Sequence, residues 1–293
     1  MPISNSVVGQ RTAEVEHNVD ARWIMAYAAA LGDMNPRMLD TATYAALIAH
    51  PVFPVCVEWP SVQATSTLPA LSQLSPAERA RGVHAAHDLH IERPIRAGDV
   101  LRTSAEVVGL EARKPGAAQT ARIETRDAAG QLVCTTWQLR IMRGVAIDGD
   151  ARRIAEPPAL PTDAGTSPCA LVIPLTVAPG AAHIYSECAH IWNPIHSDRA
   201  VALAAGLPDI ILHGTATLAL AVSAIVQRCL GGEIASDMKT ASVTRLGGRF
   251  AAMVPVPDML QLEIYRQAAD GVRFRVRNGA GQEAISQGYV LWR

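Results

Sequence analysis

The residue types best suited to chemistry lie in one stretch of the second half of the chain. It contains Asn193-Pro194-Ile195-His196, and Ile211-Leu212-His213-Gly214 follows after a short alanine-rich segment. A histidine can accept and return a proton near neutral pH. A glycine N–H at the start of a helix can donate a hydrogen bond to a carbonyl oxygen as that oxygen gains negative charge. Together these groups predict proton transfer beside a polarised carbonyl, such as that of a thioester.

This stretch resembles the motif Ser-Gly-Asp-x-Asn-Pro-(Ile/Leu)-His of the MaoC-like (R)-specific enoyl-CoA hydratases and 3-hydroxyacyl dehydratases. The chain keeps the Asn-Pro-Ile-His part, but Ile191 stands where the family places its catalytic aspartate. The resemblance implies a catalytic set of His196 for proton transfer, Asn193 to position substrate or water, and the N–H of Gly214 to bind the thioester carbonyl. It also implies that His213, Trp192 and Thr215 contact the substrate.

Each of these residues also has a structural interpretation. A lone histidine is usually a hydrogen-bonded structural or surface residue, Asn193 before a proline favours a turn, and Gly214 would allow close packing of a helix on a sheet. Asp198 is most simply the N-cap of the next helix. The motif favours function for His196 and Gly214 and leaves function and turn equally open for Asn193.

The missing acid raises the question of a substitute. Glu187 and His190 lie close to Ile191 in the sequence, and either is a candidate for that role. The first half has the reverse pattern, with an acid at Asp33 but Met38 in place of the histidine. We do not expect Asp33 to combine with His196, because in the family each acid–histidine pair comes from one half. Asp33 is expected to be a retained turn residue.

Three functions remain open. The first is a lyase that reversibly hydrates a 2-enoyl thioester of CoA or acyl-carrier protein to a 3-hydroxyacyl thioester, and it is preferred. The second is a thioesterase, for which one base and one oxyanion donor suffice. The third is a non-catalytic acyl-CoA binder, or a subunit that shapes the pocket of an active partner.

A duplication sets the expected architecture. Tyr27 precedes Asn35-Pro36 by eight residues, as Tyr185 precedes Asn193-Pro194. Helical stretches are expected at 41–48, 198–205 and from Gly214 to about Cys229. Strand pairs are expected at 121–126 with 132–141 and at 272–277 with 283–292, joined by tight Gly-containing turns.

This pattern predicts an α+β fold in which an antiparallel sheet wraps a long helix, twice over. The resemblance implies a double hotdog, with an N-terminal hotdog at 1–150 as scaffold and acyl pocket, a linker at 151–168, and the active C-terminal hotdog at 169–293. The run from Val83 to Asp99 resembles the N-terminal half of the double-hotdog hydratases of peroxisomal multifunctional enzymes. Such chains act as monomers or pair again as homodimers.

The composition narrows the possible binding partners and the possible location of the protein. A net charge of −1 and a pI near 6.8 give no sign of a basic nucleic-acid-binding face. The five cysteines are widely spaced, which favours reduced thiols in the cytoplasm, and no apolar run is long enough for a membrane span. The histidines at 84, 87 and 90 are spaced so that their side chains point to alternate faces of a strand. They would not converge on one ion, so no metal site is expected. We expect no cofactor, with CoA serving only as the substrate's carrier.

Overall fold

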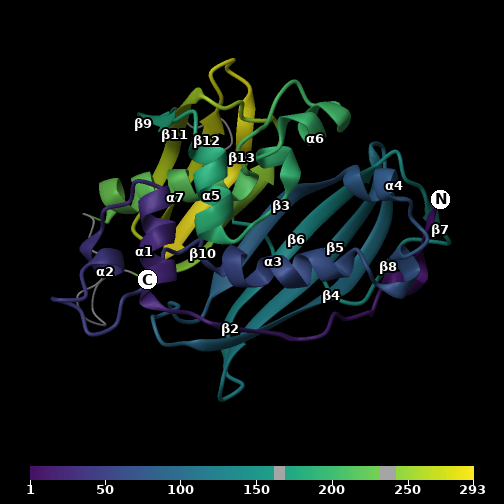
Figure 1. Ribbon diagram of the computed structural model, residues 1–293, viewed down its shortest axis with the longest axis horizontal. Helices are drawn as coiled ribbons and strands as arrows, with labels where there is room; N and C mark the ends of the chain where they lie inside the picture. Colours follow the sequence, from purple (N-terminus) through teal and green to yellow (C-terminus); the bar gives the residue numbers. More distant parts are fainter. Residues whose placement is uncertain (162–168, 231–241) are drawn as a thin grey trace. The chain divides into compact units, whose positions relative to one another are not determined.

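The computed structural model describes residues 1–161, 169–230 and 242–293 (Figure 1). Antiparallel sheets with fewer helices make the chain α+β, as the sequence predicts. The chain divides into two compact units. The first comprises Met1–His17, Val57–His90 and Val100–Leu160, and the second comprises Asn18–Cys56, Ile91–Asp99 and Pro161–Arg293.

The first unit is built on a sheet with the strand order β2-β4-β5-β6-β3, and β8 also pairs with β4. These strands are β2 (Val15–Asn18), β3 (Gly82–Ile91), β4 (Val100–Arg113), β5 (Gly116–Asp127), β6 (Leu132–Arg143) and β8 (Arg152–Arg153). Helix α3 (Pro54–Thr65) lies across the sheet, where the Ser61 hydroxyl donates to the carbonyl of Thr103 over 3.0 Å. The short elements are β1 (Ile3–Ser4), η1 (Asn5–Val7), η2 (Pro69–Leu71), α4 (Pro76–Ala80) and β7 (Ile147–Asp148).

An apolar cluster closes one end of this unit. Its buried members come from the N-terminal segment, η2 and the long strands, and they include Val7, Leu71, Val107, Leu110 and Met142. Burial of aliphatic side chains of this size stabilises a fold by about 1.5–3 kcal/mol each. The cluster therefore fixes the N-terminal segment to the sheet.

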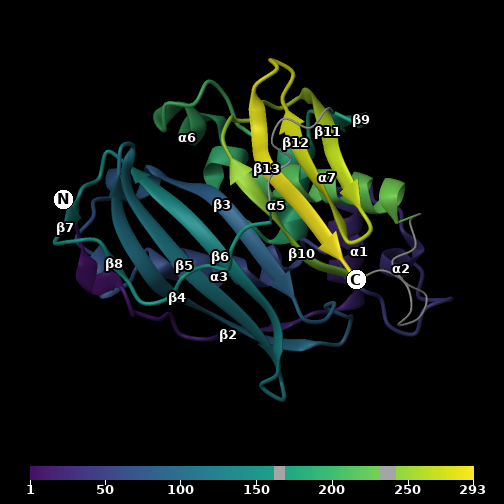
Figure 2. The same cartoon turned by 180° about the vertical axis from the view of Figure 1, so that it is seen from behind.

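The second unit has the sheet order β10-β13-β12-β11-β9. Its strands are β9 (Leu171–Val177), β10 (Val243–Phe250), β11 (Asp258–Ala268), β12 (Gly271–Arg277) and β13 (Glu283–Trp292). Helix α7 (Gly214–Cys229) contacts β13 and β9 and lies behind the sheet in Figure 2. The remaining helices are α1 (Ala21–Ala30), α2 (Pro36–Leu39), α5 (Ala181–Ala189), η3 (Pro194–His196) and α6 (Arg199–Ala204).

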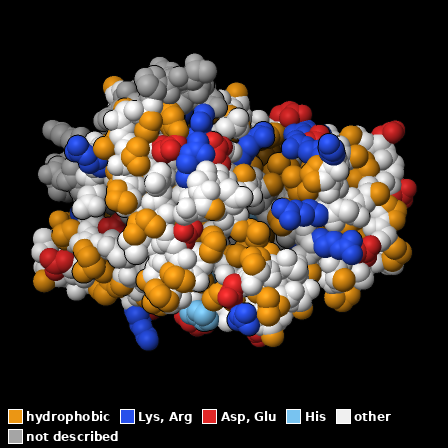
Figure 3. Space-filling model, turned by 90° about the horizontal axis from the view of Figure 1, so that it is seen from above, with side chains coloured by type: hydrophobic (Ala, Val, Ile, Leu, Met, Phe, Trp, Pro, Cys, Tyr) orange, Lys and Arg blue, Asp and Glu red, His pale blue; other side chains and the backbone are white. Residues whose placement is uncertain are grey.

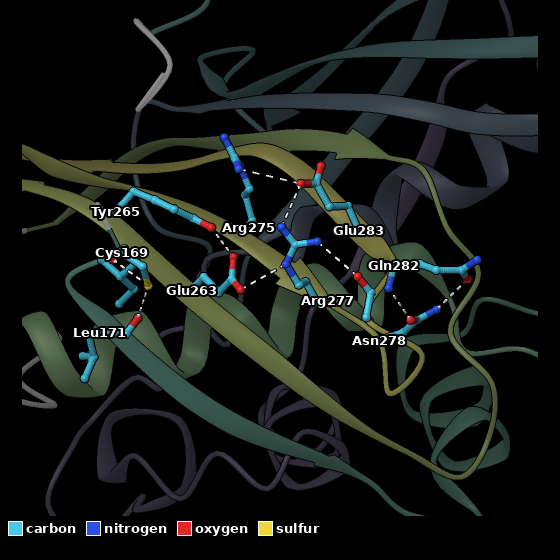
Figure 4. Close-up of polar contacts among 11 residues, drawn as sticks. Cys169, Leu171, Glu263, Tyr265, Arg275, Arg277, Asn278, Gln282 and Glu283 are labelled. Carbon is cyan, nitrogen blue, oxygen red and sulfur yellow. Dashed lines mark hydrogen bonds and ion pairs between the residues drawn. The ribbon is translucent and has the colours of Figure 1, made fainter. Parts of the chain in front are cut away.

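The duplication is visible in the two hairpin turns. Asp127 Oδ1 accepts hydrogen bonds from the N–H groups of residues 129 and 131, and Asn278 Oδ1 accepts them from those of residues 280 and 282. Gly130 and Gly281 take positive φ values of 78° and 76°, as such turns require. Figure 4 shows the second turn beside Arg277, whose guanidinium bridges the carboxylates of Glu263 and Glu283. Both predicted hairpins are confirmed.

The compact units do not coincide with the two sequence halves. Segment Asn18–Cys56 belongs to the second unit, because α1 packs against α5 and the hydroxyls of Tyr27 and Tyr185 lie 3.2 Å apart. The tyrosines of the two repeats therefore meet in one core. Of the predicted linker 151–168, residues 162–168 lie outside the described part of the chain, and the remainder includes β8.

One predicted element is wrong. Residues 41–43 form a turn, the chain continues without a helix to the β-bridge of Ile48, and the nearest helix is the preceding single turn of α2. The Asp40 carboxylate accepts hydrogen bonds from the N–H groups of Ala42 and Thr43 and from the Thr43 hydroxyl. These are N-cap bonds, and the N–H of Tyr44 also donates to the Asp40 carbonyl, so one turn starts here. It does not continue as a helix, because the backbone of Leu47 and Ala49 is bonded to residues 95–97.

On the face shown in Figure 3, basic side chains lie beside acidic ones. The five cysteines all lie within the described residues, and no disulfide joins any two of them there. Within the described ranges, no helix has the length and hydrophobicity needed to span a bilayer.

Candidate active site

The sequence motif is carried by two turns of the second unit. Helix α5 ends at His190, whose left-handed φ of 55° reverses the chain into the Asn-Pro turn and η3. The chain returns at Ile211, which forms a β-bridge with Pro255, and His213 then precedes the first residue of α7. The side chain of Asp198 accepts from the N–H groups of residues 200 and 201, so its predicted role as N-cap of α6 is confirmed.

His196 is held in one tautomer. Its Nδ1 lies 2.7 Å from the carbonyl oxygen of Ile211, so Nδ1 carries the proton and Nε2 has a lone pair. Burial lowers the pKa of His196 to about 4, and the bond to Ile211 opposes this shift. The imidazole is therefore neutral at physiological pH, as a proton acceptor must be.

The His196 ring stacks on His213, with ring centroids 3.7 Å apart and an angle of 27° between the planes. His213 is buried, and its Nε2 lies 3.3 Å from both the carbonyl oxygen of Ile191 and the hydroxyl of Ser186. Since a carbonyl only accepts, Nε2 of His213 carries the proton. Its Nδ1 is buried with no hydrogen-bond partner among the described residues. Burial keeps the pKa of His213 well below its usual range, with the neighbouring His196 acting in the same direction.

Gly214 is the first residue of α7, and this position affects both its packing and its backbone N–H. A Cβ at this position would lie 3.0–3.3 Å from the ring of Phe250, so a larger residue would require that ring to shift by a few tenths of an ångström. As the first residue of the helix, its N–H has no intrahelical acceptor. The next residue, Thr215, accepts a hydrogen bond of 3.2 Å from the hydroxyl of Tyr185.

The position at which the motif resemblance predicts an acid carries an apolar side chain. Ile191 is 4% exposed, whereas Glu187 is exposed on α5. His190 lies between two indoles, with ring centroids 4.4 Å from Trp23 and 5.4 Å from Trp192. The indole of Trp192 is 57% exposed beside the Asn-Pro turn.

The two Asn-Pro turns use their asparagines differently. Asn35 Oδ1 accepts from the N–H of Arg37 and caps α2, whereas the side chain of Asn193 makes no capping hydrogen bond to η3. Asn35 therefore uses its side chain to cap the helix that follows, whereas Asn193 does not. The amide remains a candidate to contact substrate.

The sequence reasoning missed a second polar cluster, around His50. Nδ1 of His50 accepts from the N–H of Val52 over 3.0 Å, and Nε2 lies 3.0 Å from Ser223 Oγ and 4.0 Å from Asp33 Oδ2. The available signal was the repeat, since Ile48-Ala49-His50 parallels Ile211-Leu212-His213 and Ile48 also forms a β-bridge, to Arg96.

The groups that the sequence predicted to act together are thus brought together only in part. His196, His213, Gly214 and Thr215 surround the start of α7, with the backbone of Ile191 beside them. Met38, the counterpart of His196, is buried. Over the described residues, no three His, Cys, Asp or Glu side chains converge as a metal site would need.

Comparison with known families covers both halves of the chain. Residues 6–136 match the family described as FAS1-like, dehydratase domain region, and residues 164–287 match the MaoC like domain. The 3-hydroxyacyl-thioester dehydratase Y of Mycobacterium tuberculosis is 30% identical over 208 residues, which cover 69% of this chain and 68% of that protein. The peroxisomal enoyl-CoA hydratase 2 of Arabidopsis thaliana is 27% identical over 222 residues, covering 71% and 67%.

Solved structures show the same fold. A MaoC-like dehydratase from Phytophthora capsici superimposes with a TM-score of 0.80 at 18% identity, covering 97% of this chain and 96% of the other. A Mycobacterium tuberculosis protein described as a double hotdog superimposes with a TM-score of 0.64 at 17% identity, covering 97% and 94%. The chain belongs to the MaoC-like dehydratase family and has the double-hotdog fold.

Proposed function

We propose that the chain reversibly hydrates a 2-enoyl thioester of CoA or acyl-carrier protein to the 3-hydroxyacyl thioester, with His196 as the proton-transfer group. The observation that carries this proposal is the 3.7 Å stack of His196 on His213, the residue directly before Gly214. The stack supports the proposal, because His213 directly precedes the amide that starts α7 and His196 is neutral. The dehydratase and hydratase relatives support thioester chemistry of this type.

The reaction needs a proton removed and a proton delivered. Water attacks C3 of the enoyl group while Nε2 of His196 takes one of its protons. The electron pair of the double bond moves toward the thioester carbonyl, whose oxygen gains negative charge that the N–H of Gly214 stabilises. The imidazolium then returns the proton to C2 on the same face, which gives syn addition without a second acid.

Burial affects the two steps in opposite ways. The lowered pKa of His196 keeps the ring neutral before the reaction and makes the imidazolium a stronger acid for the second step, but it makes the neutral ring a weaker base in the first. Asn193 and Thr215 line the approach, with His213 supporting the His196 ring and Trp192 presenting an exposed indole to the carrier. No cofactor takes part, since CoA or carrier protein only holds the acyl group.

The test is the consumption of crotonyl-CoA, followed by the loss of enoyl-thioester absorbance. We expect turnover by the unaltered chain and its loss in His196→Ala. The matched control is His90→Ala, which removes a half-buried histidine of the first unit bonded to Asp88. A folded His196→Ala variant with unchanged turnover would refute the role of this residue.

One observation favours a second candidate function, hydrolysis of the thioester. Ile191 cannot exchange protons, and hydrolysis requires only one base and one oxyanion donor. Release of free CoA thiol from crotonyl-CoA, without loss of the double bond, would identify a thioesterase. If neither reaction occurs but acyl-CoA raises the melting temperature, the chain is a binder.

A further inference from the structure

The second unit contains a pocket of about 780 Å³ that lies apart from His196. Its wall combines the turn after α1, the edge strand β9 and the later part of α7, and includes Asp33, Asn35, Arg37, Thr176, Leu220 and Ser223. Leu220 follows Gly214 by six residues on α7, so the pocket begins about 9 Å along the helix from its start. The size is that of a site for a small organic ligand.

One side chain of this pocket, Ser223, is oriented by a buried histidine, and Asp33 lies nearby. The N–H of Val52 donates to Nδ1 of His50, so the neutral ring carries its proton on Nε2. That proton faces Ser223 Oγ at 3.0 Å, whereas Asp33 Oδ2 lies 4.0 Å away, beyond hydrogen-bond distance. Ser223 therefore accepts from His50 and has its own hydroxyl proton to donate.

The polar groups define the ligand that fits. Asp33 Oδ1 accepts from the N–H of Asn35, and Oδ2 can accept a further hydrogen bond from a ligand hydroxyl. Ser223 supplies a donor for a carbonyl. A neutral carbonyl is favoured over a free carboxylate here, because the Asp33 carboxylate would repel a second negative charge. Arg37, whose guanidinium lies 4.7 Å over the Tyr44 ring, supplies positive charge to the wall, which suits the phosphates of CoA.

We propose that this pocket is a second binding site of the chain, which takes the 3-hydroxyacyl group of a CoA thioester between Asp33 and Ser223. The hydroxyl of the ligand donates to Asp33, and Ser223 donates to the carbonyl oxygen. The internal repeat supports this assignment, because the Asp33 turn is the counterpart of the Ile191 turn at the site of His196. Each repeat then contributes one Asn-Pro turn to one thioester site.

Calorimetric titration with 3-hydroxybutyryl-CoA tests the proposal. The His196→Ala chain is used so that the ligand is not converted. We expect two equivalents bound per chain, one of which is lost in the additional variant Ser223→Met, whose longer side chain occupies the space between Ser223 and Asp33 and removes the hydroxyl donor. Asp33→Asn, which is nearly isosteric, should weaken the same site about ten- to a hundredfold. Ser72→Met, an exposed serine of the first unit, is the matched control and should bind as the parent does.

The outcomes are separable. Binding that neither Ser223→Met nor Asp33→Asn alters, in chains that melt as the parent does, would overturn the second site. Equally tight binding of free 3-hydroxybutyrate would overturn the ligand class. Hydration by the unaltered chain is measured independently, so its failure would refute the proposed function while a bound equivalent sensitive to Ser223→Met would still establish the second site.

Discussion

At the scale of single residues, position 191 decides how many groups can move protons. Its backbone carbonyl lies 3.3 Å from Nε2 of His213, and His213 stacks on His196. A carboxylate at residue 191 would therefore start close to both imidazoles. In the proposed reaction, the isoleucine leaves the proton chemistry to His196 alone.

We predict that Ile191→Asp raises turnover of crotonyl-CoA by about 10²-fold or more, the usual contribution of one positioned acid–base group. The carboxylate would share a water molecule with Nε2 of His196. Ile191 is buried, so the same change should lower the free energy of unfolding by about 1–3 kcal/mol. Both quantities are measured on purified protein, by the absorbance assay and by urea unfolding.

The control is Ile191→Asn, which has nearly the same shape as aspartate but does not ionise. It should be destabilised to a similar extent without any gain in turnover. Equal turnover in the aspartate and asparagine variants, with both folded, would contradict the acid–base role of this position.

The sequence located some of these residues and not others for a clear reason. His196, His213 and Gly214 lie within one motif whose spacing is specific, so the stack around the start of α7 could be anticipated. His50 and Ser223 are 173 positions apart in the chain, and only folding brings them to 3.0 Å. The repeat between residues 48–50 and 211–213 hinted at His50, but nothing in the sequence pointed to Ser223.

At the scale of elements, strong local signals predicted the structure well. The glycines and the Asp or Asn of the two hairpin turns fixed both strand pairs, and α7 runs from Gly214 to Cys229 as expected. The failure at residues 41–48 came from bonds that are distant in sequence, because the backbone of Leu47 and Ala49 pairs with residues 95–97 although Asp40 makes N-cap bonds. A helix pattern without an account of such competing bonds is a weak predictor.

The start of α7 allows a direct test of the oxyanion donor. Proline is tolerated at the first position of a helix and removes the N–H, and the extended φ and ψ of His213, −61° and 138°, suit a residue before proline. Gly214→Pro should therefore lower turnover about 10²–10³-fold relative to Gly214→Ala. The comparison is made as kcat for crotonyl-CoA.

Gly214→Ala is the matched control, because it adds the same Cβ against Phe250 and keeps the N–H. Both variants should lose about 1–3 kcal/mol of stability through that contact, and adding Phe250→Leu should recover part of it. If the proline and alanine variants turn over substrate equally, Gly214 serves packing and donates no hydrogen bond to the substrate.

At the scale of the whole molecule, buried ionisable groups make stability depend on pH in opposing ways. Burial lowers the pKa of His50, His87 and His196 to about 4, so these rings are neutral in the folded chain and protonate more easily when it unfolds. As the pH falls below about 6.5, the unfolded chain takes up protons that the folded chain does not, so the free energy of unfolding decreases. Glu58 of α3 has the opposite effect, because burial raises its pKa to about 7 even though the Thr136 hydroxyl donates to it over 2.6 Å.

Glu58 should therefore destabilise the chain as the pH rises. The folded state holds the proton up to about pH 7, whereas the unfolded chain releases it near 4.5, so the stabilising contribution is complete below pH 4.5 and is lost through pH 7. The two values differ by about 2.5, which corresponds to about 3 kcal/mol. Glu58→Gln removes this titration, and its oxygen can still accept from Thr136. Its stability relative to the parent should rise by about 3 kcal/mol between pH 4.5 and pH 8 in urea unfolding.

The difference between variant and parent isolates Glu58, because the buried histidines are common to both chains. Glu14→Gln, a change at an exposed carboxylate of the same unit, is the control and should leave the difference flat across this range. A Glu58→Gln chain whose stability relative to the parent is independent of pH would mean that Glu58 is ionised in the folded state as readily as in the unfolded one. The hydrogen bond from Thr136 would then offset the full cost of burying the charge.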